Sequence, residues 1–389
     1  MAMVLQYAVG GSLLPFLTLL LRDRGLSVAQ ISGVLLVSSA SLLVSPFFWG
    51  MLADRYLPME RVFLMMNGLA ALALAGFALQ THPFGLLVTF TLFYACYQPA
   101  PILVNALALR HLRDPYRQFA ALRAWGSLGW ILPSLPIFLV LALSARGDLG
   151  FIQVIAMLCC LGMIGVSIRL PHTPPGAVHR GEATRPVLAY GPALRQLLRN
   201  PNYLVVLGSY FLVSASFAIQ SFYSPPRLED LGMARPWIGL VQSVGVLWEI
   251  ALFRWQTAIV NRLGFAGSIG VGCVALVLRQ LLFAWADNLW VLSASYLLVG
   301  TTVVLYHIGV GLLVDAIAGV QVKATAQTLL VLCSSGLGPM FANAAVQRLM
   351  AGRQEGLDRL FLFAAGLAAL ATLLIFARGK KLREPAGIG

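Results

Sequence analysis

Charge is scarce in this sequence. Only 11% of its 389 residues are Asp, Glu, Lys or Arg, whereas soluble domains carry about 25%. Hydrophobic residues make up 59% of the chain, above the roughly 45–50% that is usual for soluble domains. Together these departures exclude a water-soluble fold and are typical of a protein embedded in a membrane.

Cysteine and enzyme motifs are also scarce. The five cysteines lie inside apolar runs, with no CxxC pair and no histidine at metal-ligand spacing, which argues against a disulfide framework and a zinc site. The sequence contains no GxxxxGK[ST] phosphate loop, no HExxH motif and no GxSxG nucleophile elbow. We therefore expect no enzyme activity, no cofactor and no metal. Without an ATP-binding motif, any solute pumping must run on an ion gradient or on the solute's own gradient.

Long apolar runs fill the chain instead. A membrane-spanning helix needs about 20 mostly apolar residues. Marking such runs and their polar breaks predicts twelve spans, at about 2–21, 30–51, 62–80, 84–109, 119–144, 150–170, 202–223, 236–255, 266–285, 288–314, 325–350 and 358–377. The sequence therefore predicts an all-α polytopic membrane protein with twelve transmembrane helices.

The longest polar break divides these spans into six and six. It is rich in Pro, Gly and Arg, and it is typical of a linker between two halves. We expect an N-terminal six-helix half over 1–170, a cytoplasmic linker over 171–200, and a C-terminal six-helix half with a short basic tail over 201–389.

The net charge of +13 is explained by topology. Loops rich in Lys and Arg are retained on the cytoplasmic side. With a cytoplasmic N-terminus, seventeen basic residues fall inside, eight fall outside and two fall within spans. This distribution predicts a multi-pass protein of the cell (inner) membrane with both termini cytoplasmic, and it requires no nucleic-acid partner.

Four ionisable residues lie well inside predicted spans, away from the span ends, where charge is costly and marks functional candidates. Glu249, in SVGVLWEIALF, is a candidate proton carrier or substrate acceptor, because alternation between apolar and basic surroundings would load and release a proton. His307 is a candidate proton relay, and Arg279 is the expected partner of Glu249 or His307. The alternative for Glu249 is a structural ion pair or hydrogen bond, and for His307 a hydrogen bond between helices.

The fourth such residue, Arg123, points to solute binding. Its planar donors suit a carboxylate or the vicinal hydroxyls of a sugar. Trp130 lies about two turns further along the same predicted helix and so shares its face. A cation and an indole on one face would hold a ring with polar substituents, although each side chain also has a purely structural interpretation. Asn105 and Gln220 are weaker candidates, because such amides commonly bridge helices.

The loop after the second predicted span, GMLADRYLPMERV, resembles the signature G-x3-D-[RK]-x-G-x-[RK]-[RK] of the major facilitator superfamily. Its Gly50, Asp54, Arg55 and Arg61 match, whereas the second glycine is replaced and one terminal basic residue is missing. The resemblance implies a gating loop and the superfamily fold of two six-helix halves.

Within that superfamily, RAWGSLGWIL is similar to the fifth span of lactose permease and its relatives, which implies sugar-contacting roles for Arg123 and Trp130. Glu249 and Arg279 match charged residues of the same group. SVGVLWEIALF is similar to phenylpropionate permeases. NALALRHL, LRAWGSLGW and LPHTP are similar to bacterial nucleoside:proton symporters.

These resemblances imply proton-coupled uptake, by rocking alternating access, of a small ring-containing solute such as a nucleoside or glycoside. They also imply a monomer in the lipid bilayer whose other partners are the solute and protons. Two alternatives remain open, namely uptake of an aromatic carboxylate and proton-driven efflux of drugs or metabolites. The fifth span reads GSLGWILPSLPIF, without the GPxxGG ending of proton-driven exporters, which counts against efflux.

Overall fold

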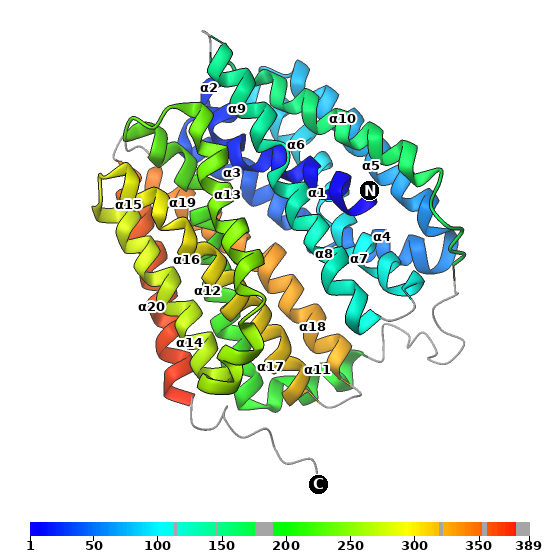
Figure 1. The fold of residues 1–389 in the computed structure, drawn as a ribbon, viewed down its shortest axis with the longest axis vertical. Helices are drawn as coiled ribbons and strands as arrows, with labels where there is room; N and C mark the ends of the chain where they lie inside the picture. The colour runs from blue at the N-terminus through cyan, green and yellow to red at the C-terminus, as the bar shows by residue number, and fades with distance from the viewer. Residues whose placement is uncertain (113–114, 145–146, 176–189, 319–321, 352–355, 379–389) are drawn as a thin grey trace. The chain divides into compact units, whose positions relative to one another are not determined.

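A computed structural model describes residues 1–112, 115–144, 147–175, 190–318, 322–351 and 356–378. All regular secondary structure in these ranges is helical (Figure 1). This agrees with the all-α expectation. Residues 176–189 of the predicted linker and the predicted tail beyond residue 378 lie outside the described residues.

The first six predicted spans form twelve helical segments. In chain order they are α1 (Ala2–Leu13), η1 (Leu14–Phe16), α2 (Leu17–Asp23), α3 (Val28–Ser41), α4 (Ser45–Met51), η2 (Leu52–Tyr56), α5 (Met59–Leu79), α6 (Pro83–Tyr97), α7 (Ala100–His111), α8 (Pro115–Ile131), α9 (Ser134–Leu143) and α10 (Gly150–Ser167). Helix starts follow local chemistry. For example, α3 begins at a capping box in which Ser27 and Gln30 satisfy each other's backbone amides.

The rest of the chain forms another twelve described segments. They are α11 (Tyr190–Arg199), α12 (Pro201–Asp230), α13 (Arg235–Leu252), α14 (Gln256–Trp285), α15 (Leu289–Ala294), α16 (Tyr296–Thr301), η4 (Thr302–Ile308), α17 (Gly309–Ile317), α18 (Lys323–Val331), η5 (Leu332–Leu337), α19 (Gly338–Met350) and α20 (Asp358–Arg378). Asn200 caps α12 by accepting from the backbone amides of Asn202 and Tyr203.

Eleven stretches of helix in the described ranges are long and apolar enough to cross a membrane. They correspond to eleven of the twelve predicted spans. The remaining span, predicted at 236–255, corresponds to α13, which has 18 residues. Arg235, Gln242 and Glu249 make α13 less apolar than the other spans.

The chain divides into two compact units, and the division does not fall only in the predicted linker. One unit comprises residues 1–183 and 232–243, and the other comprises 184–231 and 244–389. Helix α13 therefore contributes its first turns to the first unit and its last turns, which carry Glu249, to the second unit.

In the first unit, α1 packs against α8 and α10, and α5 packs between α10 and α6. Figure 1 shows α1 in blue beside α8 in teal. This close packing depends on glycine. A Cβ added to Gly11 of α1 would lie 2.0 Å from the backbone oxygen of Trp130, and one added to Gly129 of α8 would lie 2.4 Å from that of Val4. Only residues without a side chain permit this helix separation.

In the second unit, α14 packs against α20 and α12, and α12 also packs against α19. The buried core of this unit is apolar and includes Val206, Ile269, Leu276 and Ile375. Figure 1 shows yellow-green α14 beside red α20. This packing fixes the positions of the polar side chains described below.

Candidate functional site

Two of the predicted solute-binding residues meet at one tyrosine in the first unit. Asn105 of α7 donates from Nδ2 to the hydroxyl oxygen of Tyr7 at 3.4 Å. The Arg123 guanidinium of α8 lies 4.6 Å from the centroid of the Tyr7 ring, within the range of a cation–π contact. Arg123 Nη1 also donates to Ser127 Oγ at 3.4 Å. Tyr7 of α1 thus links an amide and a cation from two other helices.

Trp130 of α8 lies against α1 at Gly10, about one turn beyond Tyr7. A Cβ added to Gly10 would lie 2.8 Å from Trp130 Cζ3 and 1.9 Å from the hydroxyl oxygen of Tyr97. Residues three apart on a helix share a face, so Tyr7 and Gly10 lie on the same side of α1. Two aromatic rings therefore converge on α1 next to the cluster of Tyr7, Asn105 and Arg123.

The arrangement suits a flat polar solute. Trp130 brings an indole ring to the cluster, and Arg123 brings a planar set of N–H donors. Asn105 retains an unused acceptor, because its Oδ1 is buried without a hydrogen-bond partner among the described residues. We name Tyr7, Tyr97, Asn105, Arg123 and Trp130 the tyrosine cluster.

The second unit contains a buried arginine. Arg279 of α14 is 0% exposed. Its guanidinium lies 4.4 Å from the ring centroid of Phe283 and 4.0 Å from that of Tyr296, and Nη1 donates to Ser295 Oγ. Arg279 Nε and Nη2 have no hydrogen-bond partner in the described part of the chain. The structure therefore places Arg279 beside aromatic rings and a serine, with donors left over for a further partner.

Glu249 lies where α13 meets α16. A Cβ added to Gly300 would lie 2.8 Å from the backbone nitrogen of Glu249 and 2.5 Å from the backbone oxygen of Gly245. Nearby, Trp248 Nε1 donates to Thr301 Oγ1 at 3.0 Å. The close approach of Gly245 and Gly300 fixes the position of the Glu249 backbone relative to α16.

His307 lies in a shell of aromatic rings. It belongs to η4, a stretch of wide π-helical turns, which are often found at functional sites. Its ring centroid is 5.1 Å from that of Phe217, 5.4 Å from that of Tyr210 and 5.5 Å from that of Tyr306. His307 Nε2 is buried and has no hydrogen-bond partner among the residues described.

Gln220 belongs to a group of buried amides on α12 and α14. Its side chain is 3% exposed, and its Oε1 has no hydrogen-bond partner in the described ranges. Gln280 donates from Nε2 to both the backbone oxygen and Oγ of Ser216 at 2.9 Å. These contacts bind α14 to α12.

The predicted gating residues lie at one end of the first unit. Asp54 belongs to η2, a second π-helical stretch, and its Oδ1 is 3.5 Å from Arg110 Nη2 of α7. Arg55 and Arg61 are exposed, as expected for residues at a polar surface. At Gly50 an added Cβ would meet nothing within 4 Å, so packing does not explain the glycine.

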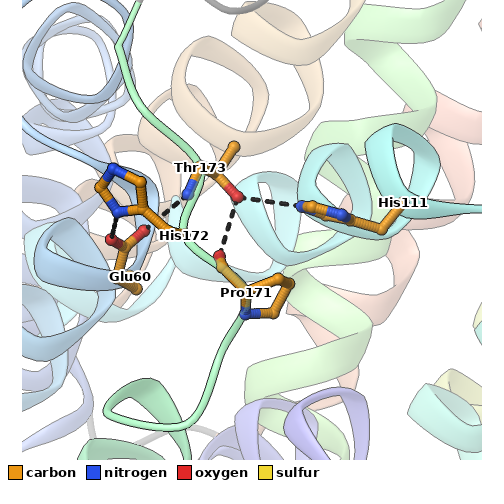
Figure 2. A network of polar contacts seen from close by, with 5 residues as sticks. All are labelled: Glu60, His111, Pro171, His172 and Thr173. Carbon is orange, nitrogen blue, oxygen red and sulfur yellow. Dashed lines mark hydrogen bonds and ion pairs between the residues drawn. The ribbon is translucent and has the colours of Figure 1, made fainter.

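A polar network joins the beginning of the predicted linker to this end of the unit (Figure 2). His172 Nδ1 is 2.6 Å from Glu60 Oε1, and the Thr173 amide donates to Glu60 Oε2 at 3.1 Å. Thr173 Oγ1 is 2.9 Å from His111 Nε2, and it also donates to the Pro171 carbonyl at 3.0 Å. LPHTP and NALALRHL, which resemble the same group of symporters, are therefore in direct contact.

The sequence singles out neither tyrosine of the cluster, and Tyr7 is the more important of the two. A tyrosine in an apolar helix has the same local pattern as any core or lipid-facing aromatic residue. Its importance follows from contacts with residues 98 and 116 positions away in the chain. The described residues contain no group of three or more His, Cys, Asp or Glu side chains that would hold a metal ion.

Comparison with known proteins agrees with this architecture. The putative nucleoside transporter YegT of Escherichia coli is 26% identical over 349 residues, covering 87% of this chain and 80% of that protein. The maltose permease of Geobacillus stearothermophilus is 25% identical over 375 residues, covering 95% and 92%. The crystal structure of the nucleoside transporter NupG superposes with a TM-score of 0.84 at 19% identity, covering 97% of both chains. At that identity the structural likeness establishes the fold.

The family follows from a match along most of the chain. The model of the MFS_1-like family matches residues 1–345. This match, the all-helical fold and the eleven spanning helices in the described ranges agree with the resemblance to the major facilitator superfamily. The chain belongs to the MFS_1-like family of multi-pass membrane transporters.

Proposed function

We propose that this protein takes up a small ring-containing solute, a nucleoside or a glycoside, together with protons. It acts in the cell (inner) membrane as a monomer with both termini in the cytoplasm. Residues 1–170 and 201–389 form the two halves that rock about the solute, joined by the linker at 171–200. The names of two relatives, the putative nucleoside transporter YegT and the maltose permease, support this solute class.

The tyrosine cluster is the observation that carries the proposal. Arg123 and Asn105 converge on Tyr7, and Trp130 of α8 contacts α1 at Gly10, one turn beyond Tyr7. Such a cluster combines ring faces with directed polar groups, which is the usual composition of a small-molecule site. Arg123 and Asn105 bind polar groups of the solute, and Trp130 packs against its ring.

The second half supplies the coupling. Glu249 carries the proton and contacts the solute, and Gln220 adds a polar contact. Arg279 has two donors without a partner in the described residues, which supports a role as a partner that Glu249 gains in another state of the cycle. His307, with its buried unpartnered Nε2, relays protons.

The loop with Gly50, Asp54, Arg55 and Arg61 forms the cytoplasmic gate. The contact between Asp54 and Arg110 supports this role, because a weak exposed pair is easily broken and remade during a conformational cycle.

Ligand-induced thermal stabilisation of the purified protein tests the solute class. A bound ligand raises the unfolding temperature by mass action. We expect stabilisation by uridine or by methyl glucoside, and its loss in Arg123→Ala but not in Arg169→Ala, which removes an exposed arginine. Stabilisation by phenylpropionate alone would transfer the proposal to aromatic carboxylates. Stabilisation by large apolar compounds alone would favour an exporter.

The coupling role of Glu249 has its own test. Glu249→Gln keeps the shape of the side chain but removes its titratable proton. We expect this variant to bind the solute but to lose accumulation driven by a pH gradient. Full gradient-driven accumulation by Glu249→Gln would disprove the coupling role.

A further inference from the structure

The Asn105 amide uses only one of its two hydrogen-bonding groups. Nδ2 donates to Tyr7, whereas Oδ1 is buried and has no partner among the described residues. An acceptor that is buried without a partner destabilises the fold, and such groups are uncommon in native proteins. A hydrogen-bond donor on a bound solute would satisfy Oδ1.

Arg123 has the opposite requirement. A guanidinium has five N–H donors and no acceptor. One of its nitrogens, Nη1, donates to Ser127 Oγ at 3.4 Å, which leaves further donors for acceptors on the solute. Among the described residues, Asn105 Oδ1 thus lacks a donor that would bond to it, whereas Arg123 has donors that lack an acceptor.

Tyr7 contacts both Asn105 and Arg123. Its hydroxyl holds the Asn105 amide, and its ring lies against the Arg123 guanidinium. Because one aromatic side chain touches both groups, we expect the solute atoms that meet them to lie close together. A nucleobase edge with adjacent N–H and C=O groups satisfies both, as do vicinal hydroxyls of a sugar. A carboxylate has acceptors alone and satisfies only Arg123.

We propose, on the basis of the function proposed above, that Asn105 Oδ1 accepts a hydrogen bond from the solute and selects solutes that carry a donor beside an acceptor. Tyr7 is the positioning residue that aims Asn105 and Arg123 at the same part of the solute. This pair favours nucleosides and glycosides and disfavours aromatic carboxylates.

The test compares the affinities of matched probes that differ in one donor group. Uridine is compared with 3-methyluridine, which lacks the base N–H, and with the 2′,3′-O-isopropylidene derivative, which lacks the ribose diol. Methyl glucoside is compared with its 2,3-di-O-methyl derivative. We expect the wild type to bind at least one blocked probe about tenfold or more weakly than its parent, the size of one well-formed hydrogen bond.

Variants at Asn105 test whether this residue causes the difference in affinity between parent and blocked probes, which we call discrimination. Asn105→Leu should reduce it to about threefold or less, because leucine is similar in size but has no acceptor. Asn105→Asp should keep it, because the carboxylate retains the acceptor. Unfolding temperatures without solute show whether each variant is folded, and Tyr7→Phe, which is expected to lose discrimination, supplies the test if the leucine variant is not folded.

Tyr7→Phe tests the positioning role. It keeps the ring against Arg123 but removes the hydroxyl, so discrimination should fall in the wild-type background and should not change further in Asn105→Leu. If uridine or methyl glucoside binds but no blocked probe is disfavoured, or if Asn105→Leu still discriminates, the inference is overturned. If neither parent probe binds the wild type, the proposed function is overturned as well.

Discussion

The contact between α1 and α8 at Gly11 gives a prediction with a calculable size. In Gly11→Ala the new Cβ would lie 2.0 Å from the Trp130 backbone oxygen, whereas ordinary contact begins at 3.4 Å. The two helices must therefore separate by about 1.4 Å, because a backbone atom cannot rotate away. Overpacking of this kind costs about 1–3 kcal/mol.

Gly165→Ala is the matched control, because a Cβ added at Gly165 of α10 meets nothing within 4 Å. Both variants gain the same helix propensity, so their difference isolates the overpacking cost. By thermal unfolding in detergent we expect Gly11→Ala to unfold about 2–6 °C below Gly165→Ala. Because Tyr7 lies one turn from Gly11, uridine binding should weaken as well. Equal unfolding temperatures would refute the close packing of α1 on α8.

Three further contacts give predictions. Arg235 donates to both Asp23 oxygens at 2.6 and 2.7 Å. Thermal unfolding of the single and double alanine variants should therefore give a coupling energy of about 0.5–1 kcal/mol. Zero coupling would contradict this ion pair. Glu60→Ala should speed hydrogen exchange at the Thr173 amide, which donates to Glu60, and unchanged exchange would refute that bond. Arg279→Met should unfold at or above the wild-type temperature, because it removes a buried cation with two nitrogens that have no partner in the described residues. A large loss of stability would show instead that the cation is structurally required.

Most of the helical architecture is predictable from the sequence, because hydrophobic runs of membrane-spanning length leave few alternatives. The least apolar of the twelve predicted spans is α13, which contains Arg235, Gln242 and Glu249. The π-helical turn around His307 was not predictable, since its apolar sequence does not differ from that of a regular helix.

The candidate site was predictable only in part. Arg123 stands out because charge is rare in a membrane span, whereas Asn105 is only a weaker candidate, because amides commonly bridge helices. Tyr7 and Gly10 have no such signal, because their roles arise from contacts with distant helices. The sequence identifies the groups that are costly to bury, and the tertiary structure is needed to identify the residues that hold them in place.

Uptake of radiolabelled uridine into proteoliposomes under an imposed inward proton gradient tests the central claim most directly. Proton-coupled uptake predicts accumulation above the external concentration, its collapse when a protonophore dissipates the gradient, and its loss in Arg123→Ala and Glu249→Gln. Uridine that only equilibrates across the membrane, to the same level with and without the gradient, would contradict proton-coupled uptake.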